Sequence, residues 1–150
     1  WRTQLQSLHA LLAQAASPQG ALPWQAAVMA HGELLSSALG ADFLGAHWLD
    51  ARGVLHAHVQ PNQSERVQRL SATLETAPDA AVAAALAQRG EVLITQGFIA
   101  RDAAGATVLL GRGGSDTSAA HFGALLRAAR VEIWTDVAGM FSANPRQVAD

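Results

Sequence analysis

A glycine-rich segment, residues 111–116 with the sequence Gly-Arg-Gly-Gly-Ser-Asp, has residue types that suit binding of an anion. Its glycines let the backbone approach a ligand closely, and Ser115 or Asp116 can cap a following helix whose free amides favour negative charge. Arg112 adds a planar guanidinium that matches a carboxylate or a phosphate with paired hydrogen bonds. The segment fits neither the dinucleotide-binding glycine pattern nor the P-loop pattern. It therefore predicts an anionic ligand, with a tight strand-to-helix turn and a solvated Arg112 as the alternative.

Other candidate residues carry weaker signals when each is taken alone. Thr135 and Asp136 end a predicted strand, where open α/β sheets bind ligands, although an aspartate there also suits an ordinary turn. Arg146 can hold a second anion or lie in solvent. Glu33 lies within a helical pattern, where glutamates are usually solvated.

Two histidines, His56 and His58, flank Ala57 and share one face of a predicted strand, a spacing that can supply two metal ligands. The sequence has no cysteine and offers no clear third ligand, so ordinary strand histidines are the favoured interpretation and no metal site is predicted. The ten basic residues are all arginines, so any mechanism that requires a lysine ammonium is incomplete within these 150 residues.

The composition indicates one globular domain with a sizeable core, because half of the 150 residues are hydrophobic and 15% are charged. The longest apolar run, residues 80–87, is far shorter than the roughly 20 residues of a membrane-spanning helix, and no secretory signal is visible. The net charge of −2 and the lack of a basic stripe argue against nucleic acid as a partner. We therefore expect neither a membrane nor a nucleic acid as partner, and the lack of cysteine fits a reducing compartment.

The first half of the chain predicts helices joined to short strands. Leucines at 5, 8, 11 and 12 give residues 2–16 one apolar helical face, and Pro23 begins a second helix that we expect to end at Gly40. The further expected elements are strands at 43–48 and 54–59 around a turn at 49–53, an ambiguous segment at 64–76 that suits a strand entering a helix, and an alanine helix that is capped by Asp79 and ends at Gly90.

The final third predicts part of a parallel sheet. Residues 91–95 suit an apolar strand, and residues 98–101 pair with residues 107–110 as a hairpin. The glycine-rich segment then leads into a helix, and a further strand is expected at 131–135. Strand, glycine turn, helix and strand are the parts of a crossover between parallel strands. No linker or charge block divides the chain into two domains.

Five segments, taken in order, resemble aspartate kinase. They are Gly32-Glu33-Leu34-Leu35-Ser36, Leu49-Asp50-Ala51-Arg52, Thr95-Gln96-Gly97-Phe98-Ile99, Gly111-Arg112-Gly113-Gly114-Ser115-Asp116, and Trp134-Thr135-Asp136-Val137-Ala138-Gly139 to Asn144-Pro145-Arg146. The resemblance is most specific between residues 96 and 146. The amino acid sequence of the last two segments looks most like the kinase part of the bifunctional aspartate kinase and diaminopimelate decarboxylase proteins.

The resemblance implies an α/β architecture, namely the three-layer αβα amino acid kinase (carbamate kinase-like) fold with a mostly parallel sheet. It implies ATP-dependent phosphorylation of the L-aspartate side-chain carboxylate to 4-phospho-L-aspartate, the first step of lysine, threonine and methionine biosynthesis. L-Aspartate and ATP would be the ligands, Mg²⁺ would accompany ATP, and the expected location is the cytoplasm. A homo-oligomer of the full-length protein is compatible with this interpretation.

The resemblance also implies roles for individual residues on the amino acid side of the site. In the matching segments, Glu33 would bind the substrate ammonium and Arg112 would bind its α-carboxylate. Phe98 and Ser115 would help to shape the amino acid site. Asp116 is the expected catalytic residue and would organise the basic groups near the transferred phosphoryl group.

The last of the five segments would supply the nucleotide side. Thr135 and Asp136 would contact the nucleotide, and Arg146 would face its phosphates. Phe141 stands where the family commonly has a tyrosine near the nucleotide. Its ring can still contact the nucleotide, but without the hydroxyl it cannot form the hydrogen bond of a tyrosine.

Family members also have a Lys-Phe-Gly-Gly strand, a nucleotide-binding lysine and regulatory domains, which residues 1–150 lack. We therefore expect residues 1–150 to be an internal part of one amino acid kinase domain, inactive on its own. Two other interpretations stay open. One is a kinase of the same fold that acts on glutamate or on an acylated glutamate, and the other is a noncatalytic nucleotide- or amino acid-binding domain that keeps the kinase scaffold.

Overall fold

The computed structural model describes residues 1–14, 20–58, 60–74 and 79–135. The helices are α1 (Arg2–Leu12), α2 (Ala21–Leu44), α3 (Glu65–Leu70), α4 (Ala80–Ala87) and α5 (Gly114–Leu125), with a short 3₁₀ helix, η2, at Ala51–Gly53. The strands are β1 (His47–Leu49), β2 (Ala57–His58), β3 (Thr73–Leu74), β4 (Leu93–Thr95), β5 (Ile99–Arg101) and β6 (Thr107–Leu109). Three expected site residues, Asp136, Phe141 and Arg146, lie outside the described residues.

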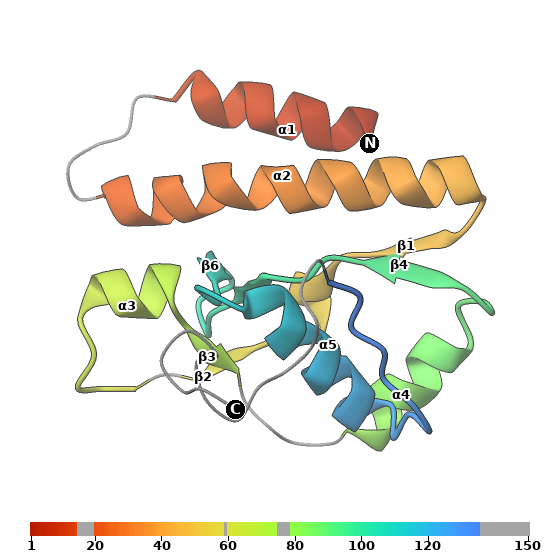
Figure 1. The fold of residues 1–150 in the computed structure, drawn as a ribbon. Helices are drawn as coiled ribbons and strands as arrows, with labels where there is room; N and C mark the ends of the chain where they lie inside the picture. Colours follow the sequence, from red (N-terminus) through yellow and green to blue (C-terminus); the bar gives the residue numbers. More distant parts are fainter. Residues whose placement is uncertain (15–19, 59, 75–78, 136–150) are drawn as a thin grey trace, which may run out of the picture.

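The long helix α2 is the element against which much of the fold packs. It contacts α1 on one side and β1, β4, β6 and α3 on the other (Figure 1). Ala26, Ala30 and Leu34 are almost completely buried, and their spacing of four residues puts them on one side of the helix. Because two of the three are alanines, the helix approaches the strands closely, and this face meets Ile99 and Leu109 in the core. In the view of Figure 1, α4 and α5 lie below β1 and β4.

The described strands form three two-stranded pairs. β1 and β4 are parallel, with His47 opposite Leu93 and Leu49 opposite Thr95. β2 and β3 are antiparallel, and β5 and β6 form the predicted antiparallel hairpin, which is confirmed. The parallel pairing that the expected fold requires is therefore present at β1–β4, where the carboxyl ends of two strands lie together.

The second helix is longer than the sequence predicts. It runs through Gly40, so the predicted end at that residue is wrong, and the strand predicted at 43–48 begins only at His47. Ala38 and Ala41, on either side of Gly40, are buried. The packing of this helix face outweighs the cost of about 1 kcal/mol for a glycine inside a helix.

Two further expectations are wrong. In the segment expected at 64–76, the described residues 64–74 contain a helix followed by a strand, the reverse of the expected order. The Ser64 hydroxyl caps α3 by accepting a hydrogen bond from the Val67 amide at 3.4 Å, so the helix begins at the start of the segment. Residues 131–135 pair with no described strand and are exposed. Val131 lies against Gly123 of α5, where an added Cβ would clash with a valine methyl group. Within the described part of the chain, the predicted crossover is therefore not completed.

The alanine-rich helix α4 and its predicted cap are confirmed. The Asp79 carboxylate accepts hydrogen bonds from the amides of Ala81 at 2.8 Å and Val82 at 3.1 Å. The helix ends at Ala87, three residues before Gly90. Among the described residues, no helix is both long enough and apolar enough to cross a membrane.

Candidate functional site

A strained turn at Phe98 connects β4 to β5. The amide of Ile99 donates a hydrogen bond to the carbonyl oxygen of Gly97 at 2.8 Å, which closes a three-residue γ-turn around Phe98. Phe98 has φ +68°, a left-handed conformation that bulky residues rarely adopt. The buried Ser118 hydroxyl holds this turn, because it accepts from the Phe98 amide at 3.0 Å and donates to the Gly114 carbonyl at 2.7 Å. Backbone strain of this kind is concentrated at functional sites.

The glycine-rich segment packs directly against this turn. A Cβ on Gly97 would lie 2.9 Å from the Cα of Ser115, so only glycine permits the approach. Gly113, with φ +70°, is the N-cap of α5, and the prediction that Ser115 or Asp116 caps this helix is wrong. The left-handed glycine turns the chain earlier, which leaves Ser115 and Asp116 exposed in the first helical turn. Their backbone amides bond to none of the described residues and are available to an anion.

Gln96 ties this turn to α2 and to the end of β1. Its side-chain oxygen accepts a hydrogen bond from the Ala51 amide at 2.8 Å, and its side-chain nitrogen donates to the Ser37 hydroxyl at 2.7 Å and to the Leu49 carbonyl at 3.2 Å. Gln96 is 2% exposed, so these bonds satisfy a buried polar group. The sequence predicts only a turn here, since the partners of Gln96 lie 45 to 59 residues away along the chain.

Glu33 lies one helical turn before Ser37 on α2, so the two residues share the side of the helix that holds Gln96. The residue is half-buried, and its carboxylate forms no hydrogen bond or ion pair with the described residues. A Cβ at the neighbouring Gly32 would meet nothing within 4 Å, so the helix surface beside Glu33 is open. A carboxylate in this position is available to a cationic group of a ligand.

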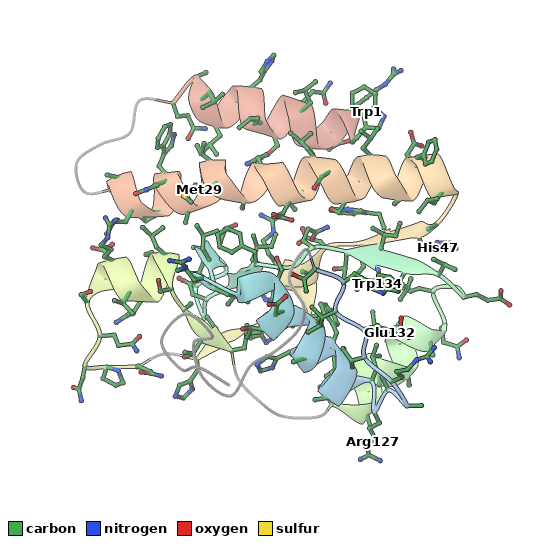
Figure 2. All side chains as sticks on the ribbon, viewed as in Figure 1. Trp1, Met29, His47, Arg127, Glu132 and Trp134 are labelled. Atoms are coloured by element: carbon green, nitrogen blue, oxygen red, sulfur yellow. The ribbon has the colours of Figure 1, made fainter. Side chains whose placement is uncertain are left out.

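A cavity of about 520 Å³ lies between α2, α3 and the glycine-rich segment. Phe98 and Arg112, two of the predicted substrate residues, line it, and Met29 lines it from α2 (Figure 2). The other lining residues are Gln25, Arg66, Val67, Leu70, Ser71, Leu109 and Gly111. The Arg112 guanidinium is exposed and has no carboxylate partner among the described residues. The structure therefore brings Arg112 and Phe98 to one cavity, whereas Glu33 lies one turn beyond Met29 and does not line it.

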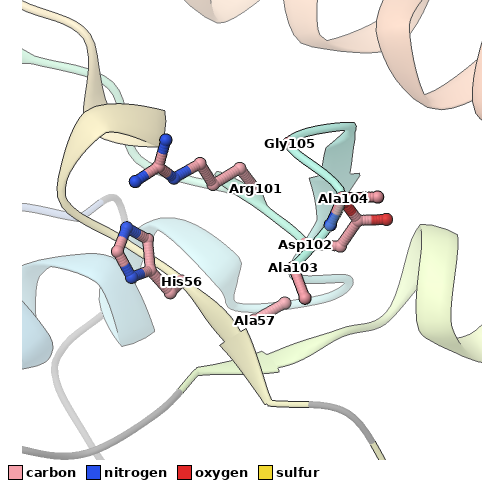
Figure 3. A pocket seen from close by; sticks show the side chains of 7 residues that line it. All are labelled: His56, Ala57, Arg101, Asp102, Ala103, Ala104 and Gly105. Carbon is pink, nitrogen blue, oxygen red and sulfur yellow. The ribbon is translucent and has the colours of Figure 1, made fainter.

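A second cavity, of about 490 Å³, lies beside the connection between β5 and β6 (Figure 3). It is lined by His56, Ala57, Arg101 and residues 102–105. The Asp102 carboxylate in its wall is already occupied, because it accepts hydrogen bonds from two backbone amides and forms an ion pair with Arg69. No residue that the resemblance singles out lines this cavity. Among the described residues, no three histidine, aspartate or glutamate side chains lie close enough together to hold a metal ion.

The Asp50-Ala51-Arg52 motif fixes the end of β1. The Asp50 carboxylate caps η2 by accepting from the Arg52 amide at 3.0 Å, and it pairs with the Arg52 guanidinium at 2.6 Å. Arg52 also donates to the Thr107 hydroxyl at 2.9 Å, which links η2 to β6. Burial alone raises the pKa of Asp50, but the hydrogen bonds and positive charge of Arg52 outweigh burial, so the net pKa is lowered. This motif therefore positions the strands rather than facing a ligand.

Replacement of Asp50 by asparagine is expected to remove a pH-dependent part of the stability. Because the folded-state pKa of Asp50 is lowered, its carboxylate stabilises the fold above the unfolded-state pKa of about 4, and this contribution is lost as the pH falls through the folded-state pKa. The difference in free energy of unfolding between the original chain and Asp50→Asn should be largest near neutral pH and shrink in acid. Urea unfolding at several pH values measures it, with the exposed Glu91→Gln as control. A difference that stays constant in acid would contradict the role of Arg52.

Replacement of Ser118 by alanine is expected to destabilise the fold by about 1 to 2 kcal/mol, because it leaves the Phe98 amide without its hydrogen-bond acceptor. The strained turn should relax as well, so ligand affinity should fall together with stability. Chemical unfolding and ligand titration of the same variant measure both effects. Ser36→Ala, on an exposed part of α2, is the matched control. Unchanged ligand affinity in Ser118→Ala would show that the Phe98 turn does not serve the site.

The nucleotide side of the site rests on fewer described residues. Thr135 is exposed beyond α5, and the other three predicted nucleotide residues, Asp136, Phe141 and Arg146, lie outside the described residues. At the carboxyl end of the parallel pair, the hydroxyl of Thr95 is buried without a hydrogen-bond partner among the described residues. This is the end at which α/β sheets bind ligands. The roles assigned to the nucleotide residues stay predictions.

Comparison with known proteins gives one family. A model described as the amino acid kinase family matches residues 3–150. The chain is 44% identical over 134 residues to the bifunctional aspartokinase/homoserine dehydrogenase 2 of Escherichia coli (strain K12), covering 83% of this chain and 15% of that protein. It is 37% identical over 128 residues to the lysine-sensitive aspartokinase 3 of the same organism, covering 81% and 27%. The chain thus spans less than a third of the length of these curated relatives.

Solved structures agree with the sequence relatives. The crystal structure of E. coli aspartokinase III in complex with aspartate and ADP (R-state) matches with a TM-score of 0.74 and 34% identity, covering 98% of this chain and 33% of that chain. The lysine and aspartate complex of the same protein (T-state) matches with a TM-score of 0.70 and 35% identity, covering 97% and 32%. The predicted α/β fold is therefore confirmed. The pairing with a diaminopimelate decarboxylase stays a prediction.

Proposed function

Because the chain belongs to the amino acid kinase family, we propose that it provides the amino acid site of an aspartate kinase, which transfers the γ-phosphoryl group of ATP to the side-chain carboxylate of L-aspartate. The observation that carries the proposal is the cavity lined by Arg112 and Phe98. Its cationic wall suits a carboxylate ligand. The aspartate and ADP bound by a structural neighbour support the same pair of ligands for this protein.

The two ends of the amino acid are recognised by opposite charges. Arg112 holds the α-carboxylate with paired hydrogen bonds, and the Glu33 carboxylate receives the ammonium group. Because neither side chain has a charged partner among the described residues, neither has to break an ion pair before it binds substrate. The Phe98 ring and Ser115 shape the space between these two charged contacts.

The reaction itself is a displacement at phosphorus. One oxygen of the aspartate β-carboxylate forms a bond to the γ-phosphorus, the bond from that phosphorus to the bridging oxygen breaks, and ADP leaves with the electron pair. The products are 4-phospho-L-aspartate and ADP. The β-carboxylate is already ionised at neutral pH, so the step requires positioning and charge stabilisation rather than a general base. The exposed amides of Ser115 and Asp116 supply donors, and the Asp116 carboxylate organises cationic groups around the phosphoryl oxygens.

We assign nucleotide binding to the last of the five segments that resemble aspartate kinase. Thr135 and Asp136 contact ATP, the Phe141 ring lies near it, and Arg146 faces its phosphates. Mg²⁺ bound with ATP would neutralise part of the negative charge of the phosphates.

Trapping of the acyl phosphate tests the proposal. The full-length protein, given ATP, Mg²⁺ and L-aspartate, should form a product that hydroxylamine converts to aspartyl hydroxamate, with one ADP per hydroxamate. L-Glutamate and N-acetyl-L-glutamate are the comparison substrates. The 150-residue chain alone should form no hydroxamate, because it contains no lysine to stabilise the transferred phosphoryl group.

The other outcomes identify the alternatives. Turnover with glutamate or its acetyl derivative in place of aspartate would assign a different kinase of the same fold. Binding of nucleotide or aspartate without turnover by the full-length protein would assign a noncatalytic binding domain. A cytoplasmic location and a homo-oligomer stay predictions.

A further inference from the structure

The helix α3 brings a second guanidinium to the cavity that holds Arg112. Arg66, Val67 and Leu70 line this cavity, and their spacing puts them on one face of α3. Arg66 is exposed and has no carboxylate partner among the described residues. Arg69, three residues further along the helix, is by contrast paired with Asp102. Of the two α3 arginines, Arg66 is therefore the one available to a ligand.

The contacts of α3 fix the position from which Arg66 reaches the cavity. The Arg69–Asp102 ion pair joins the helix to the end of β5, and the Ala72 amide donates to the Leu109 carbonyl at 2.8 Å. Ser71 packs against the glycine-rich segment, since a Cβ on Gly111 would lie 3.0 Å from its hydroxyl oxygen. The helix is thus attached on two sides to the elements that carry Phe98 and Arg112.

The charges around the cavity favour a ligand with two anionic groups. The lining contains Arg66 and Arg112 and no aspartate or glutamate. Gln25 and Ser71 add neutral hydrogen-bonding groups, and Met29 contributes an apolar wall. Two guanidinium groups on one cavity suit a ligand that carries two anionic groups.

We propose that Arg66 binds the β-carboxylate of the substrate and selects aspartate over its amide, asparagine. This inference rests on the proposed function, in which Arg112 holds the α-carboxylate and Glu33 holds the ammonium. Those two groups are common to aspartate and asparagine, so they cannot distinguish them. A guanidinium gains a charge-assisted hydrogen bond from the carboxylate and gains little from a neutral amide. One oxygen bound by Arg66 leaves the other free to attack phosphorus.

Calorimetric titration of the full-length protein with L-aspartate and with L-asparagine tests this assignment. The original protein should bind aspartate more tightly. In Arg66→Ala the ratio of the two affinities should fall by about tenfold or more, through weaker aspartate binding with asparagine binding nearly unchanged. Arg66→Lys should recover part of the preference, because an ammonium keeps the charge without the planar fork. Arg89→Ala, which removes an exposed arginine after α4, should keep the original ratio.

Each other outcome overturns a different statement. If Arg66→Ala and Arg66→Gln keep the original preference for aspartate, Arg66 does not read the β-carboxylate. If both variants weaken aspartate and asparagine equally, Arg66 supports the fold of the cavity and does not select. If the original protein binds neither amino acid and forms no acyl phosphate, the proposed function itself fails, and the role of Arg66 fails with it.

Discussion

Arg112→Ala is expected to lower kcat/KM for aspartate by about 30-fold or more, while the KM for ATP changes little. The variant removes the group that we assign to the substrate α-carboxylate, a paired charged contact worth about 2 to 5 kcal/mol once substrate shields it from water. Arg112 lines the cavity and has no protein carboxylate partner among the described residues, so its loss should leave the fold unchanged. Steady-state kinetics of the full-length protein with each substrate varied in turn measure both constants.

The lysine variant is the matched control for this result. Arg112→Lys keeps the positive charge but not the paired geometry, so it should recover only part of the lost activity. The melting temperature should stay the same in both variants. An alanine variant with the original kcat/KM for aspartate would remove Arg112 from the site.

Glu33→Gln is expected to reduce kcat/KM for aspartate by about thirtyfold without change in thermal stability. The substitution is nearly isosteric but removes the negative charge that receives the substrate ammonium, a loss of about 2 kcal/mol. A solvated helix glutamate would give a different result, because surface substitutions change stability by no more than about 0.5 kcal/mol and leave catalysis alone. Glu65→Gln, on the exposed start of α3, provides the comparison. If Glu33→Gln keeps the original kinetics and melting temperature, Glu33 is an ordinary solvated helix residue and does not bind the substrate.

The elements that could be predicted from the sequence are those with local signals. Two apolar runs around a polar connection predict the β5–β6 hairpin. Asp79 predicts the start of α4, because a capping side chain and the amides that it binds are neighbours in the chain. Arg112 could be picked out for the same reason, since its glycine neighbours mark the segment as a ligand turn. The resemblance then added Glu33, which no local pattern distinguishes from an ordinary helix residue.

The features that could not be predicted depend on contacts between distant segments. The helix α2 continues past Gly40 because Ala38 and Ala41 are buried against the rest of the fold. The three hydrogen bonds of Gln96 depend on residues of three other elements, α2, β1 and η2, and the position of Arg66 at the cavity depends on how α3 packs. Periodicity describes one element at a time and contains none of this information.

The continuity of α2 has a consequence for which wall of the cavity can move. The helix has 24 residues without a break, so it is about 36 Å long. Met29 at the cavity, Glu33 beyond it and Ser37 at Gln96 keep a fixed spacing, because changing it would break helical hydrogen bonds. The short helix α3, with six residues, is therefore expected to move more easily than α2 when a ligand binds. Amide hydrogen exchange should be faster in α3 than between Met29 and Ser37, and the reverse order would assign the opening motion to α2.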